Sequence, residues 1–122
     1  MKWLDRSLLV SPYHYALCTK EKDFQKELKR LKIPKSDWPE FISSDHANAN
    51  VHYFEHSKCC IVCLGSTKGF TKIQVYALLV HEAVHIWQAI RDDIGERCPA
   101  SEQEAYAIQS ISQQLFGAYN ER

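Results

Sequence analysis

Hydrophobic and polar residues repeat with different periods along the chain, and the changes of period predict its elements. Between residues 20 and 32, Phe24, Leu28 and Leu31 recur at near-helical spacing among charged residues. This pattern predicts a surface helix that is ended by Pro34.

Short apolar runs predict strands on either side of a polar segment. Residues 50–55 and 59–64 form two such runs joined by three polar residues, which predicts a hairpin. The aromatic run 13–19 predicts a first strand. Residues 34–50 hold Pro, Ser and Asn, so we expect a loop there with one helical turn around residues 38–42.

Two longer helices are expected in the second half of the chain. Thr71 is the predicted N-cap of a helix of about six turns that runs to about residue 93 and is closed by Gly95. A final helix is expected from near Ser101 to about Tyr119. The order of elements predicts one α+β domain over residues 1–122, in which a small sheet packs on the long helix.

The long helix carries a compact set of reactive side chains, His81, Glu82 and His85, in the pattern H-E-x-x-H. Residues four apart share one face of a helix, so the two imidazoles can bind one metal ion. Tetrahedral zinc takes such ligands, and a neighbouring carboxylate can remove a proton from water at the metal. The alternative is an amphipathic helix with two incidental histidines, but the uncharged flanks 78–80 and 86–87 favour the metal site.

A catalytic zinc ion needs a third protein ligand. One class of site uses a Gly three residues and a His six residues after the second His, but Gln88 and Arg91 occupy those positions and exclude it. The other arrangement takes a Glu from the next helix, where Glu102 and Glu104 are the candidates.

Two local arguments disagree about these glutamates. Ser101 and Glu104 have the spacing of a capping box, which gives Glu104 a structural role and leaves Glu102 free for the metal. A helical wheel instead places Glu104 nearer the centre of the apolar stripe. We favour Glu102 and keep Glu104 open. The stripe consists of Ala105, Ile108, Ile111 and Leu115.

The two motifs together resemble a known family. The spacing Glu102-x-x-Ala105, combined with residues 79–88, resembles the gluzincin branch of the zincin metallopeptidases and the small zinc peptidases of phages and prophages. The resemblance covers residues 51–119 and implies a minimal zincin-like domain, with a small β-sheet packed on a long active-site helix followed by a C-terminal helix. It implies a zinc ion held by His81, His85 and Glu102.

The resemblance also implies how substrate binds and reacts. It assigns the hairpin at residues 51–64 the role of a sheet edge that pairs with an extended peptide. Hydrolysis also needs a hydrogen-bond donor that stabilises the negative charge developing on the substrate oxygen. Tyr106, one turn after Glu102, is the first candidate. His46, His52 and Tyr53 are the others. Tyr106 occupies the position where many gluzincins have an acidic residue that accepts a hydrogen bond from a metal-bound histidine. In this chain Asp92, Asp93 or a backbone carbonyl is expected to accept that hydrogen bond.

Composition narrows the partners and the compartment. Fifteen basic and fifteen acidic residues cancel, so the chain has no broad positive charge and a nucleic acid is not expected as its partner. No apolar run is long enough for a membrane span. Charged residues near the start argue against an export signal, so a cytoplasmic location in a bacterial host is expected. Five cysteines, an odd number, indicate free thiols in a reducing compartment. Cys59, Cys60 and Cys63 are expected to be buried in a strand, and Cys63 or Cys98 as a zinc ligand is a minor alternative.

These observations predict a zinc-dependent peptidase of the H-E-x-x-H gluzincin type, with Glu82 as the general base and a peptide or protein as substrate. The alternative is a non-catalytic binding or assembly protein on a zincin scaffold, such as a phage structural or host-interaction component with structural zinc. An amidase that acts on cell-wall peptides is a third possibility.

Overall fold

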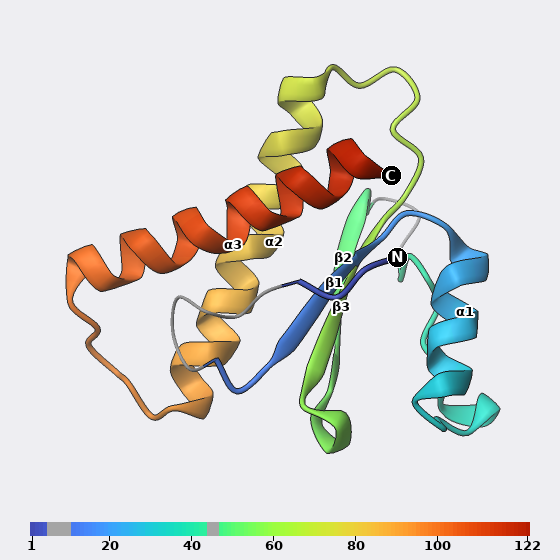
Figure 1. Cartoon of the computed structure of the whole chain (residues 1–122), viewed down its shortest axis with the longest axis horizontal. Helices are drawn as coiled ribbons and strands as arrows, with labels where there is room; N and C mark the ends of the chain where they lie inside the picture. The colour runs from blue at the N-terminus through green and yellow to red at the C-terminus, as the bar shows by residue number, and fades with distance from the viewer. Residues whose placement is uncertain (5–10, 44–46) are drawn as a thin grey trace.

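The computed structural model describes residues 1–4, 11–43 and 47–122, and it forms a small sheet with helices on both faces (Figure 1). In chain order the elements are β1 (His14–Cys18), α1 (Glu21–Arg30), a 3₁₀ turn (Lys35–Asp37), β2 (Ala49–Phe54), a 3₁₀ turn (Glu55–Ser57), β3 (Cys59–Leu64), α2 (Lys72–Asp93) and α3 (Ser101–Glu121). The predicted α+β class is confirmed.

The three strands form a mixed sheet in the order β1-β3-β2. The central strand, β3, pairs parallel with β1 and antiparallel with β2. Val51 lies opposite Val62, and Tyr53 lies opposite Cys60. In this order β2 is an edge strand, and no other strand of the described residues pairs with its outer side.

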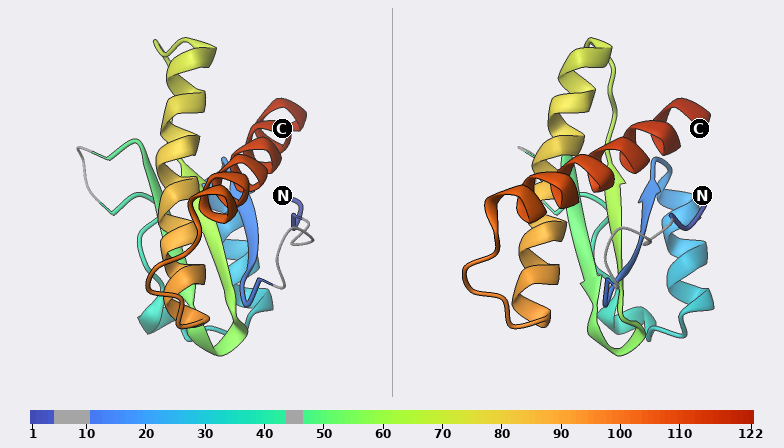
Figure 2. Two further views of the ribbon diagram at one scale, coloured as in Figure 1. Left: turned by 90° about the vertical axis from the view of Figure 1, so that its left-hand side faces the viewer. Right: turned by 60° about the vertical axis from the view of Figure 1, so that its left-hand side comes forward.

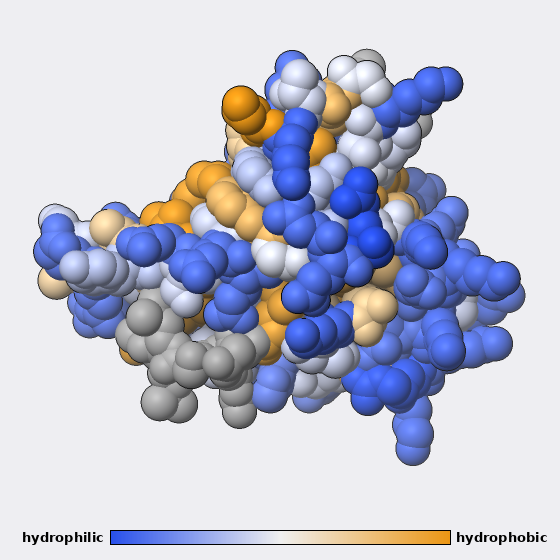
Figure 3. All heavy atoms as spheres, turned by 45° about the horizontal axis from the view of Figure 1, so that its top comes forward, coloured by the Kyte–Doolittle hydropathy of each residue, from blue (hydrophilic) through white to orange (hydrophobic). Residues whose placement is uncertain are grey.

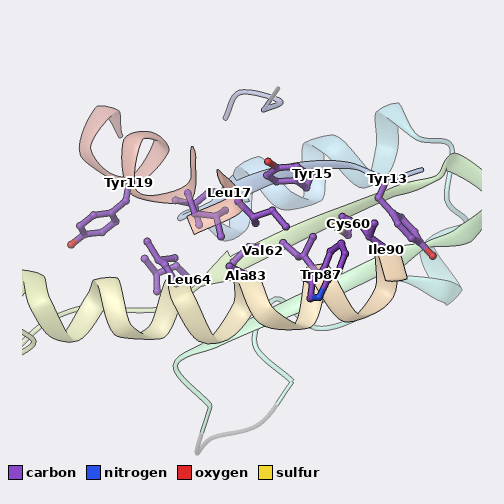
Figure 4. Close-up of a cluster of buried hydrophobic side chains, with 14 of the residues drawn as sticks. Tyr13, Tyr15, Leu17, Cys60, Val62, Leu64, Ala83, Trp87, Ile90 and Tyr119 are labelled. Carbon is purple, nitrogen blue, oxygen red and sulfur yellow. The ribbon is translucent and has the colours of Figure 1, made fainter. Parts of the chain in front are cut away.

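Each face of the sheet has its own hydrophobic cluster, because successive strand side chains point to opposite faces. On one face, β1 and β3 pack against α2 and α3, and Figure 4 shows Cys60 and Val62 of β3 beside Ala83 and Trp87 of α2. On the other face, α1 covers a smaller cluster of Cys18, Phe24, Leu28, Ile61 and Cys63. The two views in Figure 2 show the sheet between α1 and the α2–α3 pair.

The ends of α2 follow the predicted chemistry. Thr71 is the N-cap: its side chain accepts a hydrogen bond from the Gln74 backbone N–H, and the Gln74 side chain accepts one from the Thr71 backbone. At the other end Gly95 has φ 74°, and its N–H donates to the Asp92 carbonyl. These local signals fix where α2 begins and ends.

The region between α1 and β2 differs from the prediction. The expected turn around residues 38–42 is wrong, and a 3₁₀ turn lies earlier, at Lys35–Asp37. The end of α1 is set by Lys32, which has φ 58°, and Pro34 follows two residues later. No glycine marks this left-handed position, so the sequence did not indicate it.

The surface is mixed, with apolar side chains exposed around the start of α2. Figure 3 looks toward that end of the molecule and shows apolar atoms among polar ones. Phe70, Ile73 and Val80 are among the exposed large hydrophobic residues, and Ile73 is 79% exposed. Among the helices of the described ranges, none has the length and apolarity needed to cross a membrane.

Candidate metal centre

His81 and His85 project from the same face of α2, and their Nε2 atoms are 3.2 Å apart. Two nitrogens bound to one tetrahedral zinc ion at about 2.0–2.1 Å are separated by about 3.3 Å. The observed separation therefore suits two ligands of one ion. Both histidines are exposed, so an ion can reach them from solvent.

Gln88 orients the second histidine of the pair. Nδ1 of His85 lies 3.2 Å from Oε1 of Gln88, and an amide oxygen accepts, so Nδ1 donates. That tautomer leaves Nε2 of His85 without a proton, as a metal ligand requires. The sequence predicts this support from Asp92, Asp93 or a backbone carbonyl, whereas Asp93 pairs with Lys58.

Glu82 differs from the two histidines because it is an acidic residue in a buried position. The residue is only 5% exposed, and its carboxylate accepts no hydrogen bond from the residues that the structure describes. Burial raises the pKa of the Glu82 carboxyl, and the neighbouring His81 and His85 partly oppose the increase. Among the described residues the fully enclosed side-chain oxygen without a partner is that of Ser112, whereas Glu82 lines the cleft beside the two histidines, where water or a substrate can reach its carboxylate.

The three motif residues open into a cleft of about 490 Å³ between α2 and the edge of the sheet. The opposite wall includes five consecutive residues, 49–53, of which all but Tyr53 are half-buried. Because consecutive side chains alternate between faces, a run of five neighbours means that the edge of β2 forms this wall. Pro39 and Ser43 complete the cleft.

The structure does not bring a third metal ligand to the histidine pair. Over residues 1–4, 11–43 and 47–122, no three His, Cys, Asp or Glu side chains form a group that could hold a metal. Glu102 is exposed in the first turn of α3. Cys63 is fully buried in the cluster on the α1 face of the sheet, and Cys98 is exposed.

Glu104 has a different partner from the one predicted. Its carboxylate accepts a hydrogen bond of 2.8 Å from Nε1 of buried Trp87 and lies 3.9 Å from Arg91. The predicted capping box is wrong: Ala100 is the N-cap of α3 and no side chain caps it. Glu104 lies on the side of α3 that packs against α2, as the helical wheel predicts. The choice between Glu102 and Glu104 as ligand stays a prediction.

The candidate donors for catalysis lie in different places. Tyr106 is 57% exposed on α3 and is absent from the lining of the cleft, whereas Tyr53 belongs to that lining. Burial, chiefly, and the charge of Glu82 raise the pKa of the Tyr53 hydroxyl, so it stays a proton donor at neutral pH. His52 also lines the cleft, but its Nε2 donates to the Phe41 carbonyl at 3.0 Å. His46 lies outside the described residues.

The cysteines are free, and four of the five are buried; only Cys98 is exposed. Cys60 faces α2 and Cys63 faces α1, as the alternation of the strand predicts. Burial raises the pKa of both thiols. They act as small apolar core residues.

Comparison with known proteins adds no relative: no family model, no curated protein and no solved structure matches the chain. The function therefore has to be argued from the site itself.

Proposed function

We propose that this chain is a zinc-dependent hydrolase that cleaves peptide bonds in an extended substrate. The observation that carries the proposal is the carboxylate of Glu82, on a residue that is only 5% exposed and lines the cleft, beside two imidazoles with Nε2 atoms 3.2 Å apart. A binding site for metal alone has no use for a buried general base.

The donor set of the two histidines fits zinc, and His81 and His85 would hold it. Zinc bound there would lower the pKa of water and polarise the scissile carbonyl. Glu82 would take the proton of the attacking water and pass it to the leaving amine. Tyr53, from β2, would donate a hydrogen bond to the oxygen on which negative charge develops. Glu102, or Glu104 as the alternative, would have to approach the pair to complete the ligand set.

The edge of β2 supports an extended peptide as the substrate. Beyond the pairing with β3, no backbone hydrogen bond joins residues 49–54 to another described residue. The outward N–H and C=O groups of this strand can therefore pair with an added chain alongside the cleft.

The proposal is tested by incubating the zinc-loaded protein with a mixture of unstructured peptides and following cleavage by mass spectrometry. The wild-type chain is expected to cleave at least about a hundredfold faster than Glu82→Gln, which keeps the shape but cannot take a proton. Glu96→Gln, an exposed carboxylate in the α2–α3 loop, is the matched control and should cleave like the wild type. Equal rates for the wild type and Glu82→Gln would refute the proposal.

The position of β2 at the edge of the sheet also supports a second function. A protein that binds extended peptides without cleaving them needs the open edge of β2 but no third metal ligand. Capture of peptides by the zinc-loaded wild-type chain, with no cleavage over long incubation, would establish this alternative in place of the hydrolase.

A further inference from the structure

The cleft at the histidine pair continues into a second, larger cavity along β2. This cavity has a volume of about 730 Å³ and shares Pro39, Val51, His52 and Tyr53 with the cleft. Together the two cavities follow the chain from residue 49 to residue 57. A chain paired with the edge of β2 would pass both.

The two cavities differ in chemistry. The cleft has His81, Glu82 and His85 on its α2 side. The second cavity lies next to the segment that joins α1 to β2, and much of its wall is apolar. The apolar wall residues are Leu31, Ile33, Pro34, Pro39, Val51 and Phe54, and the lining also includes Lys32, Asp37, Glu55 and His56.

This apolar wall is fixed in place by hydrogen bonds. The Ile33 N–H donates to the Leu28 carbonyl at 3.1 Å, and Nε1 of Trp38 donates to the Ile33 carbonyl at 2.9 Å. Pro34 and Pro39 have no N–H, so at these positions the segment cannot donate to the edge of β2 as a fourth strand would. The segment therefore does not donate to the strand at these positions; it contacts β2 at the His52 side chain, which donates to the Phe41 carbonyl, and it forms a wall beside the strand.

The two cavities meet at the middle of β2, where both are lined by Val51, His52 and Tyr53. Val51 packs on the cluster under α2, whereas Phe54 packs on the cluster under α1, and the His52 ring stacks on Phe24 of α1 at 5.2 Å. The part of an added strand beside residues 49–50 would therefore lie at the histidine pair, and the part beside residues 54–57 would lie at the apolar cavity.

We propose that the cavity walled by Leu31, Ile33, Pro34, Pro39 and Phe54 is a specificity subsite that receives a bulky apolar side chain, such as Leu, Phe or Met, from an extended peptide. The inference rests on the peptide substrate of the proposed function. It adds that the apolar residue lies toward the Phe54 end of β2, away from the part of the peptide that faces the histidine pair.

The test measures binding and does not depend on catalysis. Metal-free Glu82→Gln protein is mixed with a positional library of eight-residue peptides, in which each position in turn is Leu, Ala or Asp, and affinities are measured by fluorescence anisotropy. One position should favour Leu over Asp by at least about tenfold, which corresponds to about 1.4 kcal/mol. Binding without such a preference, or no binding at all, overturns the proposal.

Variants locate the preference on the protein. Ile33→Asp places a charge in the cavity wall and should abolish the preference for Leu, and Ile33→Phe, which fills the cavity, should reduce it without a buried charge. Ile73→Asp is the matched control, because Ile73 is 79% exposed on α2 and does not line the cavity. A preference that survives both Ile33 changes overturns the proposal. A preference without hydrolysis by the zinc-loaded wild type would refute the hydrolase and leave the subsite standing.

Discussion

Two sides of α2 show what this helix contributes. Toward α3, Trp87 is buried and its Nε1 donates to Glu104, so the carboxylate on that side has a hydrogen-bond partner. Toward β2, Glu82 is buried with no donor among the described residues, and His81 and His85 face a cleft. The first side stabilises the fold, whereas the second carries a cost in stability.

The difference teaches that burial alone does not identify a structural residue. Glu82 and Glu104 are both glutamates on helices and both are at least partly buried, yet only Glu104 is explained by its contacts. The unexplained carboxylate lies beside the two potential metal ligands. This coincidence is why we assign function to the β2 side of α2.

The largest expected effect comes from a change on the side of α2 that packs against α3. Trp87→Ala should lower the free energy of unfolding by about 3–5 kcal/mol, because it leaves a large cavity and removes the donor to Glu104. Urea unfolding followed by circular dichroism measures the change. Ile73→Ala, at an exposed position of the same helix, should change it by less than about 0.5 kcal/mol. A similar loss of stability in both variants would contradict the conclusion that the α3 side of α2 stabilises the fold.

The second effect concerns the β2 side alone. Gln88→Ala removes the acceptor that orients His85 and should weaken zinc binding about tenfold, with the stability of the metal-free protein little changed. Competition with a fluorescent zinc chelator measures the affinity. Gln113→Ala, at an exposed position on α3, serves as the control, and equal affinities in both variants would remove the role given to Gln88.

The third effect compares the two glutamates directly in metal-free protein. Glu82→Gln should raise the free energy of unfolding by up to about 1 kcal/mol at neutral pH, because burial disfavours the charged carboxylate and Gln carries no charge. Glu104→Gln should lower it by up to about 1 kcal/mol, because Trp87 then donates to a neutral acceptor. Changes of the same sign would contradict the contrast between the two sides of α2.

The gain in stability from Glu82→Gln should become smaller as pH falls. Burial raises the pKa of the Glu82 carboxyl in the folded protein, so the wild type loses stability as pH rises through the unfolded and then the folded pKa. Below the unfolded pKa of about 4.3 the carboxyl is protonated in both states and the advantage of Gln should vanish. Unfolding curves at acid and neutral pH measure this difference, and an advantage that grows toward acid pH would contradict the burial of a charged Glu82.

The smallest effect tests the core on both faces of the sheet. A thiol reagent should modify one cysteine quickly in the native protein, Cys98, and all five after denaturation. Fast native modification of Cys60 or Cys63 would contradict the packing of β3.

The sequence predicted the parts of the molecule that depend on short-range signals. The bounds of α2 follow from Thr71 and Gly95, and the convergence of His81 and His85 follows from the period of a helix. Gln88 could also have been predicted, because a residue three positions after His85 shares its face.

The parts that the sequence did not predict depend on competition over long range. Glu104 had the correct spacing to cap its own helix, but the buried N–H of Trp87, seventeen residues away, takes its carboxylate. Satisfying a buried donor is worth more than satisfying an exposed N–H at a helix end, which water can serve. In the same way, the place of Tyr53 beside the cleft depends on how the edge strand packs against α2, which local patterns do not encode.

The most direct test of the account is the metal content of the purified protein, measured by elemental analysis after incubation with zinc and removal of excess ion. We expect about one zinc per chain in the wild type and in Glu82→Gln, and almost none in the His81→Ala/His85→Ala double variant. Glu102→Ala and Glu104→Ala measured in parallel show which glutamate, if either, completes the ligand set. A wild-type chain that takes up no zinc, or a double variant that keeps it, would contradict the assignment of the β2 side of α2 as a metal site.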